Sequence, residues 1–236
     1  SCRFLLINLR KFVTSPFTKE AKFDFAYFAA VTQKAQRMMD DLIDLELEAV
    51  DTIIAKIKAD PEPDDVKLVE LNLWNKIRNA AVNGRRTGLG ITALGDAFAY
   101  LNTAYGSDES ISLTSEIYKC LALNSYKASI VMAKERGPFP IFSRDVERNH
   151  PFIRRIMDAD PELNELYEMY GRRNIANTTT APAGSTSIET QTTSGCEPVL
   201  FEEATRFRKI NPSDKAARVD KIDAKGDKWQ SYKIFH

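Results

Sequence analysis

The sequence predicts an α/β protein in which strands alternate with helices along the chain. Residues 4–13 form an apolar, strand-like segment. Residues 23–57 carry apolar side chains at three- and four-residue spacing, which is typical of an amphipathic helix. Residues 85–107 contain an apolar strand interrupted by glycines, which leads into a helix near Asp96. Strands that alternate with helices in this way indicate the α/β class.

The remaining elements follow in chain order. Helical periodicity resumes over residues 66–82 after two prolines and ends at Asn83-Gly84, and further helices are expected over residues 111–136 and 161–170. Residues 138–151 contain three prolines and are expected to form a long loop. The tail from Phe207 is charged, with a hairpin turn expected at Asp223–Gly226 between a strand holding Val219 and a strand holding Trp229.

Composition excludes several classes of partner. The 236 residues are 43% hydrophobic, which suffices for a sizeable core. Lys plus Arg and Asp plus Glu both number 33, so no net positive charge favours nucleic acid or an anionic membrane. No apolar run approaches the roughly 20 residues of a membrane span. We therefore expect a soluble, cytoplasmic protein with neither a nucleic acid nor a membrane as partner.

Two groups of residues that could hold a metal are not expected to do so. Three scattered cysteines and two histidines offer no metal-ligand spacing, so no zinc site is predicted. Asp40, Asp41 and Asp44 follow one another on the first long helix, where a solvated helix face is favoured over a cation site. Cys120 is expected to be a packed small hydrophobic residue inside a helix.

Small and hydroxyl-bearing residues gather in the segment 174–200, where a core would require bulk. Around Gly184, backbone N–H groups and the hydroxyls of Ser185, Thr186 and Ser187 are suited to hold a phosphate. An equally weighted alternative is purely structural: residues 178–180 as an edge strand, then a turn, then the first residues of a short helix. No P-loop or dinucleotide-binding fingerprint is present. Gly88, Gly90 and Gly95 are expected to permit close helix-to-strand packing rather than to bind phosphate.

Five ordered segments resemble the catalytic subunit of ribonucleotide reductase. They read SCRFLLINLRKFV, then FDF with MMDDLIDLE, then RRTGLGITALGDAFAYL, then RRNIANTTTAPAGSTSIETQTTSGCEPVLF, and finally RKINPSDKAARVD with GDKWQSYKIFH. The SGCEP and NPSDKAARVD segments are most similar to the adenosylcobalamin-dependent (class II) type. The resemblance covers essentially the whole chain and implies the C-terminal half of a ten-stranded α/β barrel over residues 1–205. Residues 206–236 then form a charged hairpin appendage.

The resemblance also implies functional residues. Cys2 occupies the place of one of two cysteines that become a disulfide as the substrate loses its 2′-hydroxyl. From its spacing alone, Cys2 would be an ordinary buried cysteine at the start of a strand. Five consecutive residues match the family's turn around the substrate phosphates, namely Pro182, Ala183, Gly184, Ser185 and Thr186. Cys196 matches a position without a redox role.

The sequence departs from the family in what it lacks. The chain begins at Ser1-Cys2 without a methionine and inside an apolar strand, so we expect a piece of a longer polypeptide, although a processed chain would look the same. No CxE motif, which bears the family's radical cysteine and general base, occurs in the sequence. The chain alone is therefore expected to be inactive.

The resemblance then defines the expected partners and function. The partners are a ribonucleotide substrate, the missing N-terminal half and a thioredoxin-like reductant, and a homodimer is left open. The full-length enzyme is expected to be a ribonucleoside-diphosphate reductase that uses adenosylcobalamin and thiyl-radical chemistry. A noncatalytic nucleotide- or phosphate-binding module and a complementing half of a split enzyme remain as alternatives.

Overall fold

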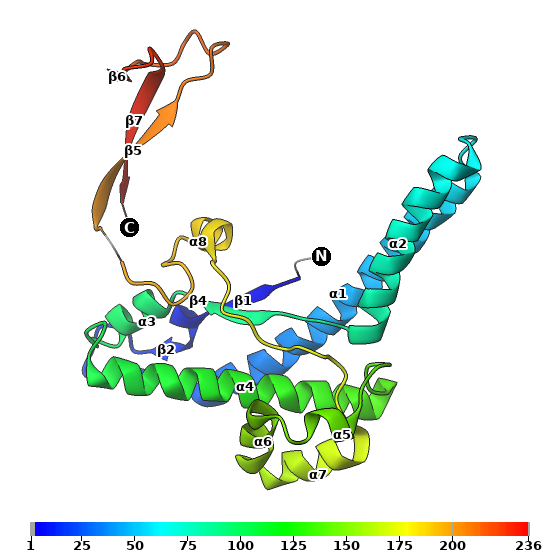
Figure 1. The fold of residues 1–236 in the computed structure, drawn as a ribbon. Helices are drawn as coiled ribbons and strands as arrows, with labels where there is room; N and C mark the ends of the chain where they lie inside the picture. Colours follow the sequence, from blue (N-terminus) through cyan, green and yellow to red (C-terminus); the bar gives the residue numbers. More distant parts are fainter. Residues whose placement is uncertain (1–2, 200, 236) are drawn as a thin grey trace.

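A short parallel sheet lies at the centre of the molecule (Figure 1). The computed structural model describes residues 3–199 and 201–235. Strand β1 (Leu5–Asn8) pairs in parallel with β4 (Leu89–Thr92), with Leu5 opposite Leu89. On the other edge of β4, residues 176–179 run alongside through a parallel bridge between Leu89 and Thr178. The edge strand that the sequence suggested for residues 178–180 is thus present in part, at this bridge.

Two long helices cover one face of this sheet. Helix α1 (Phe25–Ala59) begins at Asp24, whose carboxylate accepts a hydrogen bond from the Tyr27 N–H at 2.9 Å. Helix α4 (Asp108–Arg136) packs along α1, and α3 (Leu94–Tyr100) follows β4 directly. Side chains from the sheet and these helices form the main core, which includes Ile7, Phe28, Leu89, Ile91, Phe98, Ile117 and Leu121. Helix α8 (Gly184–Thr190) lies on the side of the sheet opposite to α4 (Figure 1).

The first strand is shorter than the sequence predicts. After Asn8 the chain turns into a 3-10 helix, η1 (Leu9–Phe12), before β2 (Val13–Thr14) pairs with β3 (Lys22–Phe23). The turn buries both Leu9 and Phe12 in the main core. In a continued strand these two side chains would point to opposite faces of the sheet, so they could not both be buried in the same core. The prediction of a strand over residues 4–13 is therefore correct only for its first half.

A helical hairpin projects from the body of the molecule (Figure 1). It comprises the second half of α1 and helix α2 (Asp64–Gly84), joined through Pro61 and Pro63. Helix α2 ends at Arg85, which adopts a left-handed conformation with φ of 43°. The predicted helix over residues 66–82 and its stop at Gly84 are confirmed.

Three short helices form a second core below α4 (Figure 1). They are α5 (Arg144–Glu147), α6 (Pro151–Asp158) and α7 (Pro161–Tyr170). Their apolar side chains pack against Tyr126 and Ile130 of α4. The loop expected over residues 138–151 is therefore interrupted by α5, and Pro151 begins α6, at a position where the missing N–H of proline costs nothing.

The C-terminal tail is a three-stranded antiparallel sheet that extends away from the body (Figure 1). Its strands β5 (Glu203–Lys209), β6 (Lys221–Ile222) and β7 (Lys228–Phe235) lie in the order β5-β7-β6. The predicted turn at Asp223 joins β6 to β7, with the Gly226 N–H donating to the Asp223 carbonyl at 3.0 Å. Strand β5 crosses the predicted boundary between residues 205 and 206. The tail contains three strands, one more than the expected hairpin.

The described residues contain mixed helices and strands, and they do not confirm the predicted half of a ten-stranded barrel over residues 1–205. In the described residues, the parallel sheet consists of β1, β4 and the bridged segment 176–179. No helix among residues 3–199 and 201–235 is long and apolar enough to cross a membrane.

Candidate phosphate-binding turn

The predicted turn lies where the parallel strands end. The chain leaves segment 176–179, passes through Pro182 and Ala183, and enters α8 at Gly184. Because the three strands run in parallel, their carboxyl ends lie at one edge, beside this turn. Ligands of open α/β sheets bind outside the carboxyl ends of the strands. The structure thus brings Pro182, Ala183, Gly184, Ser185 and Thr186 together at such an edge.

The turn presents free hydrogen-bond donors to solvent. Among the described residues, no acceptor takes the N–H of Ser185 or Thr186, whereas the Ser187 N–H donates to the Ala183 carbonyl at 2.8 Å. Unpaired N–H groups in the first turn carry a partial positive charge and attract anions. Gly184 is exposed, and a Cβ added there would meet nothing within 4 Å. The space in front of the donors is therefore open.

The hydroxyls of this segment divide into two sets. Those of Ser185 and Thr186 make no hydrogen bond within the described residues. Ser187 is buried, and its hydroxyl donates to the Gly184 carbonyl at 2.8 Å, so its expected role as a phosphate donor is wrong. The hydroxyl of Thr190 likewise caps α8 internally, at 2.9 Å from the Thr186 carbonyl. The structural alternative is present, because a short helix begins at Gly184, whereas phosphate binding at its free donors stays a prediction.

The far end of α8 is fixed to the strand ends. Arg10, which follows β1, donates to the carbonyls of Thr190 and Gln191, both at 3.2 Å. A cation at a helix C-terminus is favourable because the helix dipole is negative there. Beyond α8, the Thr193 N–H donates to the Asp96 carboxylate at 2.6 Å. The turn is thus held between the central sheet and the start of α3.

The glycines around β4 allow backbones to approach closely. A Cβ at Gly90 would lie 2.6 Å from the Thr179 carbonyl oxygen and 2.9 Å from a Leu6 methyl. A Cβ at Gly95 would lie 2.8 Å from the Glu197 carbonyl oxygen. Close packing is therefore present, but not between a helix and a strand as predicted: Gly90 meets neighbouring extended segments, and Gly95 of α3 meets residues outside any strand. Gly90 therefore allows the segment 176–179, which leads into the turn, to lie close to β4.

The prediction of a solvated acidic face is correct for Asp41, which is exposed, but wrong for Asp40. The Asp40 side chain is fully buried and accepts hydrogen bonds from Arg85 and from Asn174, both at 2.8 Å. Arg173 and Arg136 also lie within ion-pair distance of Asp40. Burial raises the pKa of the Asp40 carboxyl, but the hydrogen bonds and charges of Arg85, Asn174 and Arg173 outweigh it and hold the pKa below 3.8. The sequence could not show this, since the arginines lie 45 to 133 residues away.

This buried network orients the start of the segment that leads to the turn. The Asn174 side-chain oxygen accepts from Gln36 at 3.1 Å and from Ser129 at 2.9 Å. Its amide nitrogen donates to Asp40 and to the Arg85 carbonyl. Every hydrogen-bonding site of the Asn174 side chain is therefore used. Asp40, Asp41 and Asp44 lie close enough for one cation, but three arginines already balance their charges.

Of the three cysteines, the structure describes Cys120 and Cys196. Cys2 lies outside the described residues, so its predicted redox role and its distance from the turn stay predictions. Cys120 is half-buried and packs against the main core, as expected, and burial raises the pKa of its thiol. Cys196 also packs against this core, and its carbonyl accepts a hydrogen bond from the Tyr105 hydroxyl at 2.7 Å.

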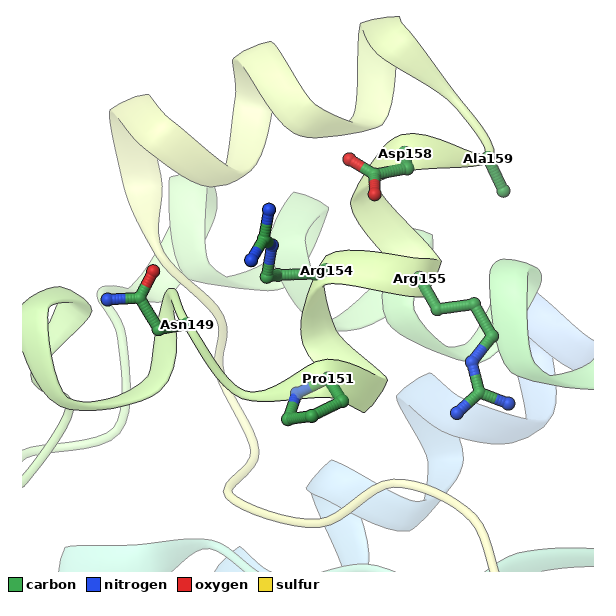
Figure 2. Close-up of a pocket in the computed structure, with 6 residues that line it drawn as sticks. All are labelled: Asn149, Pro151, Arg154, Arg155, Asp158 and Ala159. Carbon is green, nitrogen blue, oxygen red and sulfur yellow. The ribbon is translucent and has the colours of Figure 1, made fainter.

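Two cavities lie on the helical side of the molecule, away from the turn. One, of about 540 Å³, lies along α6 and is lined by Asn149, Arg154 and Asp158 among others (Figure 2). The other, of about 580 Å³, lies between α4, α6 and residues 178–180. Neither is lined by residues 182–186. These cavities are therefore separate from the predicted phosphate site.

The fold defines a class of protein: an α/β protein in which a turn with unpaired N–H groups follows the carboxyl edge of a short parallel sheet. The family model for the ribonucleotide reductase barrel domain matches residues 1–219. The chain therefore belongs to the ribonucleotide reductase family.

Individual relatives are named as ribonucleoside-diphosphate reductases. The vitamin B12-dependent ribonucleoside-diphosphate reductase of Mycobacterium tuberculosis (strain CDC 1551 / Oshkosh) is 30% identical over 162 residues, covering 66% of this chain and 21% of that protein. The protein of the same name from Thermoplasma acidophilum is 26% identical over 202 residues, covering 85% and 20%. The ribonucleoside-diphosphate reductase large subunit of Monkeypox virus is 24% identical over 162 residues, covering 62% and 21%. The chain thus spans about a fifth of the length of these relatives.

Proposed function

We propose that this chain supplies the substrate phosphate-binding turn and one redox cysteine of a ribonucleoside-diphosphate reductase. The observation that carries the proposal is the pair of free N–H groups at Ser185 and Thr186, next to the open space at Gly184. Donors fixed before binding need no rearrangement to receive a phosphate. The match of residues 1–219 to the reductase barrel domain supports a ribonucleotide as the source of this phosphate.

The catalytic roles follow from the family. Cys2 would donate electrons and a proton as the substrate's 2′-hydroxyl leaves as water, and would end as a disulfide with a second cysteine outside this sequence. A thioredoxin-like reductant would then restore both thiols. The ten-stranded barrel, of which residues 1–205 would form a part, belongs to the same proposal. The chain alone is expected to be inactive, because it has no CxE motif.

The cobalamin dependence is proposed from the names of two relatives. When bound, adenosylcobalamin would supply the radical that such enzymes use. Neither of the two described cavities borders residues 182–186, so neither would hold a corrin next to the proposed substrate site. We therefore assign no residue of this chain to the cofactor and derive no step through it.

The turn can be tested by removing one donor at a time. Proline is tolerated in the first turn of a helix, so Ser185→Pro removes the N–H and the hydroxyl with little damage to α8. Ser185→Ala removes the hydroxyl alone and serves as the matched control. Calorimetric titration with cytidine 5′-diphosphate should show about tenfold weaker binding for Ser185→Pro and a smaller loss for Ser185→Ala. Equal affinity in all three proteins would remove the turn from substrate binding.

A further inference from the structure

The cavity between α4 and α6 combines an apolar floor with a polar rim. Its floor is formed by Leu121, Ala122, Phe152 and Ile156, and its volume of about 580 Å³ is typical of small-molecule sites. Tyr118 and residues 178–180 contribute hydroxyl groups along one side. Such a cavity can bury a flat apolar group while polar atoms at the rim fix its orientation.

Two cations stand at the rim without a carboxylate partner. Lys119 of α4 and Arg155 of α6 both line the cavity and are exposed. Among the described residues, neither forms an ion pair. The Arg155 guanidinium lies 6.0 Å from the centre of the Phe152 ring, which orients it along the aromatic wall. The rim therefore carries uncompensated positive charge directly above an apolar floor.

The cavity is distinct from the substrate turn but lies behind the same segment. Thr178 is bridged to β4, and Thr180 precedes Pro182 by two residues. The cavity lies on the helical side, whereas α8 lies on the opposite side of the sheet (Figure 1). An occupant would contact the segment that leads to the turn without reaching the turn.

We propose that this cavity is a binding site for an organic anion with a flat apolar body. The body lies on Phe152, Ala122 and Ile156, and the anionic group pairs with Lys119 and Arg155. The inference does not depend on the proposed reductase activity, since it rests on residues outside the turn.

The test uses two fluorescent probes that differ by one charge. 8-Anilinonaphthalene-1-sulfonate carries an anionic sulfonate, and N-phenyl-1-naphthylamine has the same aromatic body without it. Both are titrated against the 236-residue chain and against Lys119→Ala and Arg155→Ala. Arg154→Ala is the matched control, because Arg154 is adjacent on α6, lines only the other cavity and extends in another direction than Arg155 (Figure 2).

The proposal predicts one sulfonate site per chain. Lys119→Ala and Arg155→Ala should each weaken the sulfonate probe about tenfold, the loss typical of a hydrogen bond to a charged group, and leave the neutral probe unchanged. Arg154→Ala should alter neither. Ala122→Phe, which fills the floor, should abolish the binding of both probes. Equal effects of Arg154→Ala and Arg155→Ala, or several bound probes that persist in Ala122→Phe, would overturn the proposal.

Discussion

Replacing Asp40 by asparagine should destabilise the chain more than any other change of one charge on α1. The substitution preserves shape but removes the negative charge from a fully buried site that contacts Arg85, Arg136 and Arg173. It also places an N–H₂ or a neutral oxygen opposite the Arg85 Nε donor. The buried arginine charges then lose their common partner, and this loss is the physical source of the effect.

The magnitude follows from what remains after the change. Removing one partner of a buried ion pair costs about 3–5 kcal/mol. Arg85 retains two hydrogen bonds to Asp44, at 2.8 and 3.0 Å, so we expect a loss near the low end, about 3 kcal/mol. Asp41→Asn is the matched control, because its side chain is half exposed and, among the described residues, forms an ion pair with Arg136 alone. An exposed pair of this kind contributes at most about 1 kcal/mol.

Urea unfolding followed by circular dichroism at 222 nm measures this difference, because helices dominate the signal. With a slope of about 2 kcal/mol per molar urea, Asp40→Asn should lower the midpoint by about 1.5 M. Asp41→Asn should lower it by no more than about 0.5 M. If Asp40→Asn proved as stable as Asp41→Asn, the network would not hold α1, α2 and the segment at Asn174 together.

Three further predictions concern the same framework. Gly90→Ala should lower stability by about 1–3 kcal/mol, because its Cβ would lie 2.6 Å from the Thr179 carbonyl, whereas Gly184→Ala has open space and should be nearly neutral in thermal unfolding. The low pKa of Asp40 contributes stability that is present above pH 3.8 and lost as the pH falls further, so the difference between the wild type and Asp40→Asn should shrink below pH 4 in acid unfolding. Burial and the hydrogen bond to Glu147 raise the pKa of Tyr167 above 10, so stability tied to its protonated form is lost as the pH rises beyond 10, and Tyr167→Phe should flatten this alkaline loss.

Each of these has a result that would contradict it. Equal melting temperatures of Gly90→Ala and Gly184→Ala would show that the strands separate easily at Gly90. A constant difference between the wild type and Asp40→Asn from pH 6 to pH 2 would mean that the carboxylate charge does not stabilise the fold. An alkaline transition unchanged in Tyr167→Phe would assign that loss to other tyrosines.

Local patterns predicted the long helices well, because a buried helical face repeats within a few residues. Helices α1, α2, α4 and α7 begin and end within three residues of their predicted bounds. The strand over residues 4–13 was only half right, since tertiary packing of Leu9 and Phe12 decides where the strand ends. Helix α6 was not predicted, because the segment with three prolines was interpreted as a loop. One of these prolines, Pro151, is the first residue of the helix.

The sequence predicted where the candidate site lies, but not the buried contacts that hold the segment leading to it. Small and hydroxyl residues around Gly184 marked the turn, and the structure exposes the donors of Ser185 and Thr186. The pairing of Asp40 with Arg85 and Arg173 depends on chain segments far apart in the sequence, so no local pattern could reveal it.

The central claim is that the turn at residues 182–186 receives the phosphates of a nucleotide. The most direct measurement is an amide nitrogen–proton NMR titration of the chain with cytidine 5′-diphosphate, with cytidine as the control. The account predicts that the amide signals of Ser185 and Thr186 shift with the diphosphate and not with cytidine. Shifts that are absent there, or that occur equally with the nucleoside, would contradict it.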